Sequence, residues 1–354
     1  MSEGRAADPP EGVDLGRLAP WFAEHVPGAS GAPLTAELIA GGRSNLTYAI
    51  SDGTRTWVLR RPPLGHVVAT AHDMAREYTV VRALAATDVP VPRVDAFCDD
   101  TDVNGAPFYV MERVDGRILR TPDDMAGLTP EDARRCSHEL IDVLARLHAV
   151  DFEAVGLGEF GRPDGFLARN VARWGKQWRA NTTREAPQID ELARRLDRAL
   201  PESGPPAIVH GDYRLDNTML APDDPGRIVA VLDWEMSTLG DPLTDLGLFL
   251  VYWGGDAAPE IGASAGIASV DGFISKDEIV ARYADQSGRS IEHLDFYVVF
   301  ATYKLAVILE GINARFLMGK TLGDGFTDMG AMVEQLADRA LAVADGSADP
   351  LLHG

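Results

Sequence analysis

Cysteine is nearly absent from this chain of 354 residues. The two cysteines, Cys98 and Cys136, do not have the spacing of a metal site. The pattern therefore excludes a disulfide framework and a structural zinc site, and it favours a cytoplasmic protein.

Long apolar runs are also missing. The most continuous one, residues 246–253, is far shorter than the roughly 20 residues that a membrane-spanning helix needs. Residues 1–12 are polar and rich in Pro and Gly, unlike a secretory signal. We therefore expect no membrane partner.

Basic residues are in deficit. The chain has 54 acidic and 33 basic residues, which gives a formal net charge of −21. Such a charge repels nucleic acid, so no nucleic-acid partner is expected. It is compatible with a cationic substrate, but an ordinary solvated acidic surface explains it as well. Lysine is especially scarce, and the first lysine of the chain is Lys176.

The first third of the chain has the pattern of a small sheet with one inserted helix. A helix is expected over residues 15–25, unless Pro20 shortens it. Apolar residues at helical spacing predict another helix over residues 69–86. The expected strands are two within residues 37–50, around a turn at 41–45, and one each at 56–61, 94–98 and 108–113.

Long helices dominate after Gly116. Thr129 and Pro130 form a helix-start signal, and Ser275 with Glu278 forms a capping box. Further helices are predicted over residues 294–317 and 329–343, and short strands over 207–209 and 228–232. The predicted fold class is α+β, with a small β-rich N-terminal lobe and a larger helical C-terminal lobe.

Two acidic motifs follow the short strands of the second part. His210-Gly211-Asp212 is followed by Asn217, and the next strand ends at Asp233. Phosphoryl transfer needs one carboxylate to orient and deprotonate the attacking hydroxyl, and oxygen ligands for Mg²⁺. Any one of these acids alone could merely cap a turn, but their order and flanking strands favour a metal-phosphate centre.

This pattern resembles the aminoglycoside phosphotransferase and choline kinase-like family, whose catalytic loop reads H-G-D-x-x-x-x-N. The resemblance implies a bilobal protein-kinase-like fold over nearly the whole chain after about residue 30. It implies that Asp212 is the catalytic base, that Arg214 stabilises charge near the transferred phosphate, and that Asn217 and Asp233 bind Mg²⁺. The implied domains are a tail and leading helix at 1–28, a nucleotide-binding lobe at 29–113, and a catalytic and substrate lobe at 114–350.

The same resemblance implies a nucleotide site in the first lobe. The turn at 41–45 would cover the phosphates, although an ordinary hairpin turn would look alike. Residues 108–114 resemble the hinge strand that binds adenine through its backbone, although a plain core strand fits that pattern too. The residues implied in nucleotide binding are Gly42, Ser44, Asn45, Arg60, Glu77, Glu112 and Val114.

Arg60 stands where the family usually has a lysine that pairs with the glutamate at Glu77. Arg keeps the charge and can bind phosphate through two nitrogens, but it does not replace an ammonium group geometrically. The sequence Val-Leu-Arg-Arg-Pro-Pro at 58–63 resembles the branch of the family that is associated with acyl-CoA dehydrogenases. Arg60 also motivates an alternative function, a nucleotide-binding pseudokinase with a sensing or scaffolding role.

The sequence thus predicts an ATP- and Mg²⁺-dependent kinase that acts on a hydroxyl of a small molecule. The acceptor could be a hydroxyacyl-CoA, which the acyl-CoA dehydrogenase branch favours, or an aminoglycoside-like compound. We expect a monomer or homodimer. His210, Asp241 and Asp245 are predicted to hold the catalytic loop, and a few aromatic residues are weak substrate candidates, more often found in a core: Trp174, Trp178 and Tyr303.

Overall fold

A computed structural model describes residues 10–40, 45–64, 73–254, 267, 270–319 and 328–354. By their internal contacts, the residues form two compact units. Unit 1 comprises residues 1–116 together with 229–235, and unit 2 comprises 117–228 together with 236–354. The domain boundaries expected from the sequence, after residues 28 and 113, stay predictions.

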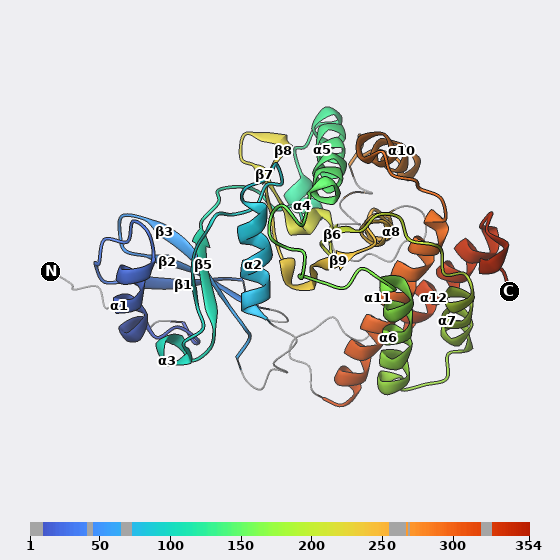
Figure 1. Ribbon diagram of the computed structural model, residues 1–354, viewed down its shortest axis with the longest axis horizontal. Coiled ribbons are helices and arrows are strands. Elements are labelled where there is room, and N and C mark those ends of the chain that lie inside the picture. The colour runs from blue at the N-terminus through green and yellow to red at the C-terminus, as the bar shows by residue number, and fades with distance from the viewer. Residues whose placement is uncertain (1–9, 41–44, 65–72, 255–266, 268–269, 320–327) are drawn as a thin grey trace. The chain divides into compact units, whose positions relative to one another are not determined.

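Unit 1 is built around a five-stranded antiparallel sheet in the order β1-β2-β3-β5-β4 (Figure 1). The strands lie where the sequence pattern placed them, and each is five or six residues long. Helix α2 was expected to begin at residue 69, but it begins at Met74 after an Asp73 cap. The elements are α1 (Leu15–His25), β1 (Thr35–Ala40), β2 (Leu46–Ser51), β3 (Thr56–Arg61), α2 (Met74–Leu84), β4 (Val94–Cys98), α3 (Thr101–Asn104) and β5 (Phe108–Glu112).

The two faces of this sheet carry different apolar clusters because successive side chains of a strand point to opposite faces. Trp57 and Leu59 pack with Phe22 of α1 on one face, whereas Val58 packs with Met74 of α2 on the other. Helix α1 continues through Pro20. Proline removes one hydrogen bond of the helix, and burial of Leu18 and Phe22 offsets that loss.

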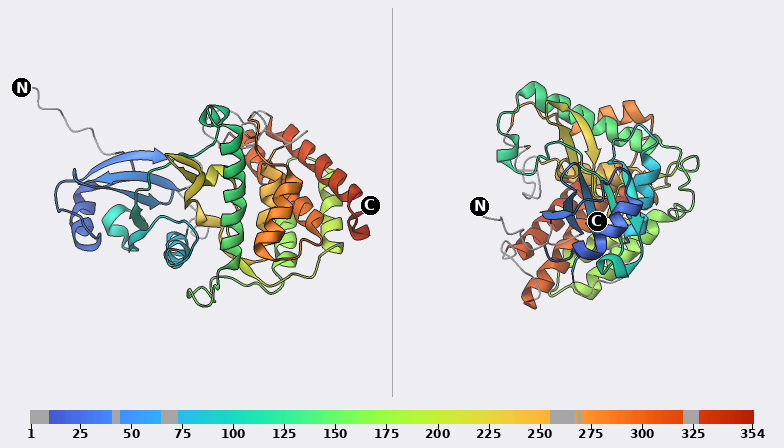
Figure 2. Two further views of the ribbon diagram at one scale, coloured as in Figure 1. Left: turned by 90° about the horizontal axis from the view of Figure 1, so that it is seen from above. Right: turned by 90° about the vertical axis from the view of Figure 1, so that its left-hand side faces the viewer.

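Unit 2 is mainly helical, and its centre is the 24-residue helix α11. Helices α11 and α12 lie side by side, in orange and red in Figure 2. Helix α8 packs closely on α11 because Gly247 has no side chain: a Cβ there would lie 2.6 Å from the Tyr297 carbonyl oxygen. The helices are α4 (Pro122–Met125), α5 (Pro130–Ala149), α6 (Phe166–Asn181), α7 (Pro187–Arg198), α8 (Leu243–Tyr252), α10 (Lys276–Ser287), α11 (Leu294–Leu317) and α12 (Met329–Gly346).

Two small two-stranded sheets carry the acidic motifs. Strand β6 (Ala207–Val209) pairs with β9 (Thr238–Gly240), and β7 (Thr218–Ala221) pairs with β8 (Asp224–Val231). Strand β8 is longer than expected, since it begins at Asp224 instead of residue 228. The sequence reading did not locate α6, α7, β7 or β9. No helix in the described ranges is long and apolar enough to span a bilayer.

Candidate functional site

The loop after β6 is held in place by Asp245 of α8. The backbone amides of His210 and Gly211 donate to the two carboxylate oxygens of Asp245, at 2.7 and 2.8 Å. Burial acts to raise the pKa of Asp245, but its hydrogen bonds to His148 and to the backbone outweigh burial and keep this pKa below its usual value. An ionised carboxylate therefore fixes the start of the loop, which is the structural role expected of Asp245.

His148 of α5 supports this carboxylate from behind. Its Nε2 lies 3.2 Å from Asp245 Oδ2, and its Nδ1 lies 2.8 Å from the Tyr283 hydroxyl. Burial lowers the pKa of His148, although Asp245 opposes the shift. A neutral imidazole with both nitrogens engaged orients a carboxylate without competing for its charge. No motif in the sequence pointed to His148.

Asp212 and Asn217 are brought together in unit 2. The Asn217 amide nitrogen donates to the Asp212 backbone oxygen at 2.9 Å and to Asp212 Oδ2 at 3.0 Å. The Asp212 backbone amide in turn donates to Nδ1 of the buried His210, at 3.2 Å. One carboxylate with a defined orientation, 27% exposed, is thus held at the end of a strand.

Arg214 lies against the carboxylates of the same loop. Its guanidinium is 3.4 Å from Asp212 Oδ2 and 2.8 Å from Asp216 Oδ2. It also lies over the ring of Tyr252, 4.9 Å from the ring centroid. The predicted role of Arg214 near a transferred phosphate stays a prediction.

Gly211 allows the loop its shape. Its φ is +85°, and a Cβ at this position would lie 2.7 Å from the Met236 backbone oxygen. We expect Gly211→Ala to lower the free energy of unfolding by at least about 1–2 kcal/mol, the cost of a left-handed conformation in a residue with a Cβ.

Urea unfolding would measure the loss. Gly204→Ala is the matched control, because a Cβ at Gly204 would meet no atom within 4 Å. Equal stability of the two variants would contradict the steric account of the loop.

A second charged cluster lies within unit 1, where Arg60 of β3 contacts two carboxylates. Its Nε is 2.9 Å from Glu77 Oε1, and its Nη2 is 2.5 Å from Asp233 Oδ1. Burial acts to lower the pKa of Arg60, but Glu77, Tyr109 and Asp233 outweigh it, so this pKa is raised. The guanidinium is therefore permanently charged, and it forms with Glu77 the ion pair that the sequence assigned to this position.

Asn45 joins the same cluster. Its amide nitrogen donates to Glu77 Oε2 at 3.1 Å and to Glu235 Oε2 at 3.3 Å. Tyr109 lies opposite Arg60 in the β3–β5 register, and burial together with the charge of Glu77 raises the pKa of its hydroxyl; it was predicted only as part of the strand 108–114. Gly42 and Ser44, which were also expected to contact nucleotide, lie outside the described residues.

The predicted hinge lies at the end of β5. The Glu112 amide donates to the Arg93 carbonyl at 2.9 Å, and Glu112 lies opposite Trp57 in the β3–β5 register. Val114 follows the strand, and among the described residues its amide makes no backbone hydrogen bond. Both residues keep their predicted roles as predictions.

The donor chemistry fits magnesium. The side-chain nitrogen of Asn217 donates to Asp212, so the side-chain oxygen of Asn217 is the atom that could bind a cation. Asp233 supplies a partly exposed carboxylate. Mg²⁺ is usually bound by one or two protein oxygens, water and substrate phosphates. Asp233 also has φ +66°, a left-handed conformation that aspartate adopts more often than most non-glycine residues. Within the described ranges, no group of three or more His, Cys, Asp and Glu side chains forms a metal cluster.

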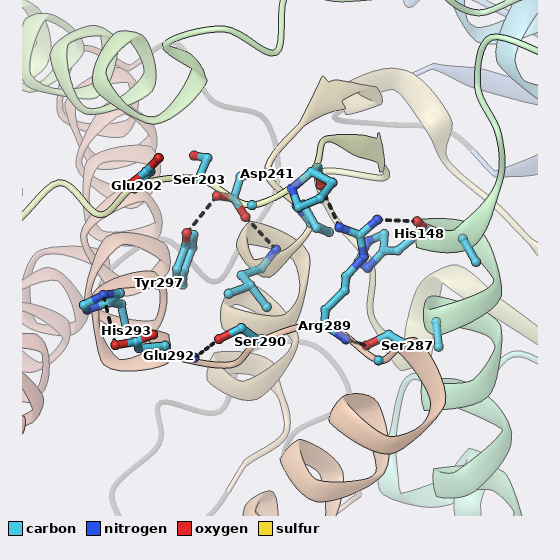
Figure 3. A pocket seen from close by; sticks show the side chains of 17 residues that line it. His148, Glu202, Ser203, Asp241, Ser287, Arg289, Ser290, Glu292, His293 and Tyr297 are labelled. Atoms are coloured by element: carbon cyan, nitrogen blue, oxygen red, sulfur yellow. Dashed lines mark hydrogen bonds and ion pairs between the residues drawn. The ribbon is translucent and has the colours of Figure 1, made fainter.

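Unit 2 also contains a pocket of about 610 Å³ (Figure 3). His148 and Asp241 line it, and neither Asp212 nor Asn217 does. The Tyr297 hydroxyl donates to Asp241 Oδ2 at 2.7 Å, and the Leu243 amide donates to Asp241 Oδ1 at 3.1 Å. Asp241 thus caps the start of α8 and links it to α11, whereas the predicted contact of Asp241 with the catalytic loop stays a prediction.

Comparison with known proteins identifies the family. A model of the phosphotransferase enzyme family matches residues 35–272. The chain belongs to this family. A crystal structure of a candidate aminoglycoside phosphotransferase from Ralstonia eutropha JMP134 is 36% identical, with a TM-score of 0.80, over 93% of this chain and 98% of that one. Aminoglycoside phosphotransferase APH(4)-Ia, solved with AMP-PNP and hygromycin B, is 15% identical with a TM-score of 0.61, over 93% of this chain and 99% of that one, and it shows the fold alone.

The chain is also similar to acyl-CoA dehydrogenase family members. Member 11 from Rattus norvegicus is 33% identical over 95% of this chain and 44% of its own length. The chain therefore spans less than half of that relative. The predicted family, its branch and the bilobal kinase-like fold are confirmed, and the class of small-molecule phosphotransferase is supported.

Proposed function

We propose that this phosphotransferase moves the γ-phosphoryl group of ATP to a hydroxyl of a small molecule. The observation that carries the proposal is the pairing of Asp212 with Asn217 in a loop that buried partners hold rigidly. In phosphoryl transfer the protein mainly positions the reactants and neutralises charge, and a rigid carboxylate suits that role.

Asp212 would orient the acceptor hydroxyl and take its proton as the oxygen attacks phosphorus. Asn217 and Asp233 would hold Mg²⁺, which when bound offsets the charge of the phosphate oxygens. Arg60, held by Glu77, would neutralise phosphate charge on the nucleotide, and the backbone at Glu112 and Val114 would bind the base.

The pseudokinase alternative is the weaker proposal. Its motivation was the replacement of lysine by Arg60, yet Arg60 contacts Glu77 at 2.9 Å. The replacement therefore keeps the ion pair that a lysine would make. Asp212, Asn217 and Asp233 are all present as well.

Charges beside Asp212 bear on the acceptor. A polycationic acceptor would need unpaired acids there, but Arg214 pairs with Asp212 and Asp216, and Lys304 adds positive charge. This balance supports an acceptor with an anionic part, as in a hydroxyacyl-CoA, over an aminoglycoside. Similarity to acyl-CoA dehydrogenase family members supports the same choice.

The test is Mg²⁺-dependent ADP release with hydroxyacyl-CoAs, aminoglycosides, macrolides and small amino alcohols as acceptors. We expect release with hydroxyacyl-CoAs. Release with aminoglycosides alone would support the proposed kinase activity and contradict the proposed hydroxyacyl-CoA acceptor. ATP binding without release in any arm would favour the pseudokinase.

A further inference from the structure

Lys304 lies in the middle of α11 and contacts the catalytic loop. Its ammonium group donates to the Gly211 backbone oxygen at 2.9 Å. Gly211 directly precedes Asp212. Lysine is scarce in this chain, so an ammonium group at this place is unusual against an arginine-rich background.

Two helices therefore hold one glycine by its two polar backbone groups. Asp245 of α8 accepts from the Gly211 amide at 2.8 Å, and Lys304 of α11 donates to the Gly211 carbonyl. The helices approach each other closely at Gly247. The negative carboxylate of Asp245 holds the amide of Gly211, and the positive ammonium of Lys304 holds its carbonyl. Together the two packed helices therefore fix the backbone direction from Gly211 to Asp212.

The surroundings of Lys304 are consistent with such a role. Within the described residues, no carboxylate lies within 4.0 Å of its ammonium group, and its one hydrogen bond is to Gly211. Burial lowers its pKa, and Asp212 and Asp245 oppose the shift. The ammonium also lies 5.8 Å from the centroid of the Trp174 ring, a weak substrate candidate that is buried here. A lysine that served only the core would be better satisfied by a direct ion pair.

We propose that Lys304 is a positioning residue for Asp212, acting through the Gly211 carbonyl. This inference rests on the proposed function of Asp212. An arginine could still donate to the carbonyl from this position, whereas a methionine of similar length could not. The charge-assisted hydrogen bond of Lys304, rather than the packing of its side chain, holds the loop in position.

The first test is hydrogen exchange, which needs no acceptor. The amides of His210, Gly211 and Asp212 are the reporters, because each donates within the loop assembly. In Lys304→Met we expect their exchange to accelerate about tenfold or more, the fold-change for a lost hydrogen bond to a charged group. Exchange in the β1–β5 sheet should not change, and Lys304→Arg should restore protection. Lys176→Met, at an exposed lysine of α6, is the matched control.

The second test is kinetic. Lys304→Met should lower kcat by about 100-fold, the scale of a small misplacement of a catalytic group, with the KM for MgATP unchanged. Lys304→Arg should recover most of kcat. Wild-type exchange and wild-type kcat in Lys304→Met would overturn the proposal. The two proposals can fail separately. If exchange accelerates in Lys304→Met but the wild-type protein transfers no phosphoryl group, Lys304 still supports the loop, and the function proposed for Asp212 is overturned.

Discussion

Asp212→Asn is expected to reduce phosphoryl transfer by about 10²–10⁴-fold, the usual contribution of a positioned general base. The asparagine oxygen can still accept from the Asn217 amide nitrogen, which donates to Asp212 Oδ2 at 3.0 Å. The loop should therefore keep its shape, and the loss should come from the missing proton acceptor. ADP release under saturating acceptor and MgATP measures the change.

The control for this variant is Asp223→Asn, since Asp223 has 84% of its side chain exposed and lies in the same unit. Its turnover should equal that of the wild type. Affinity for nucleotide, measured by fluorescence titration, should be the same in both variants. Undiminished transfer in Asp212→Asn would show that another group takes the proton.

Arg60→Met is expected to destabilise the protein by about 3–5 kcal/mol at neutral pH, the cost of removing one partner of a buried ion pair. Glu77 is 1% exposed and would lose its closest positive charge, and Asp233 would lose a contact of 2.5 Å. Nucleotide affinity should fall at least about tenfold, because a charge that offsets the phosphates is lost. Urea unfolding and nucleotide titration measure the two effects.

The stability loss should depend on pH. Burial raises the pKa of Glu77, and Arg60 acts in the opposite direction. Without Arg60 this pKa rises further above its unfolded value, so the folded variant takes up a proton more readily than the unfolded chain. Its stability then increases as the pH falls, and the gap to the wild type should be widest near pH 8 and narrower near pH 5.

Arg17→Met is the matched control, because Arg17 and Asp14 of unit 1 are 66% and 53% exposed and form a surface ion pair that contributes at most about 1 kcal/mol. Arg60→Lys should recover part of the stability, since an ammonium group can satisfy Glu77 but does not have the fork that reaches Asp233 as well. Equal losses in Arg60→Met and Arg17→Met would mean that the Arg60 cluster adds nothing to the fold.

Local patterns were sufficient for many elements. A short apolar run that ends before Pro62 located β3 at 56–61, and a similar short run located β4 at 94–98. The helix of residues 294–317 follows from its long apolar pattern. The loop His210–Asn217 and Asp233 were found because their residue types and spacing form a motif that can be recognised in the sequence alone. Helices α6 and α7 were not located although a local signal was present: Pro187 begins α7, and its buried residues Ile189, Leu192 and Leu196 have helical spacing.

The sequence by itself determined the family, the order of sheet and helices, and the position of the acids, because these depend on residue type and short spacing. Tertiary structure alone decided which groups hold them. His148 supports Asp245 from one helix and Lys304 contacts Gly211 from another, and Arg60 meets Asp233 across 173 positions. Such contacts depend on how the buried faces of the helices and strands pack, and a local pattern of residues does not show which distant residues will meet.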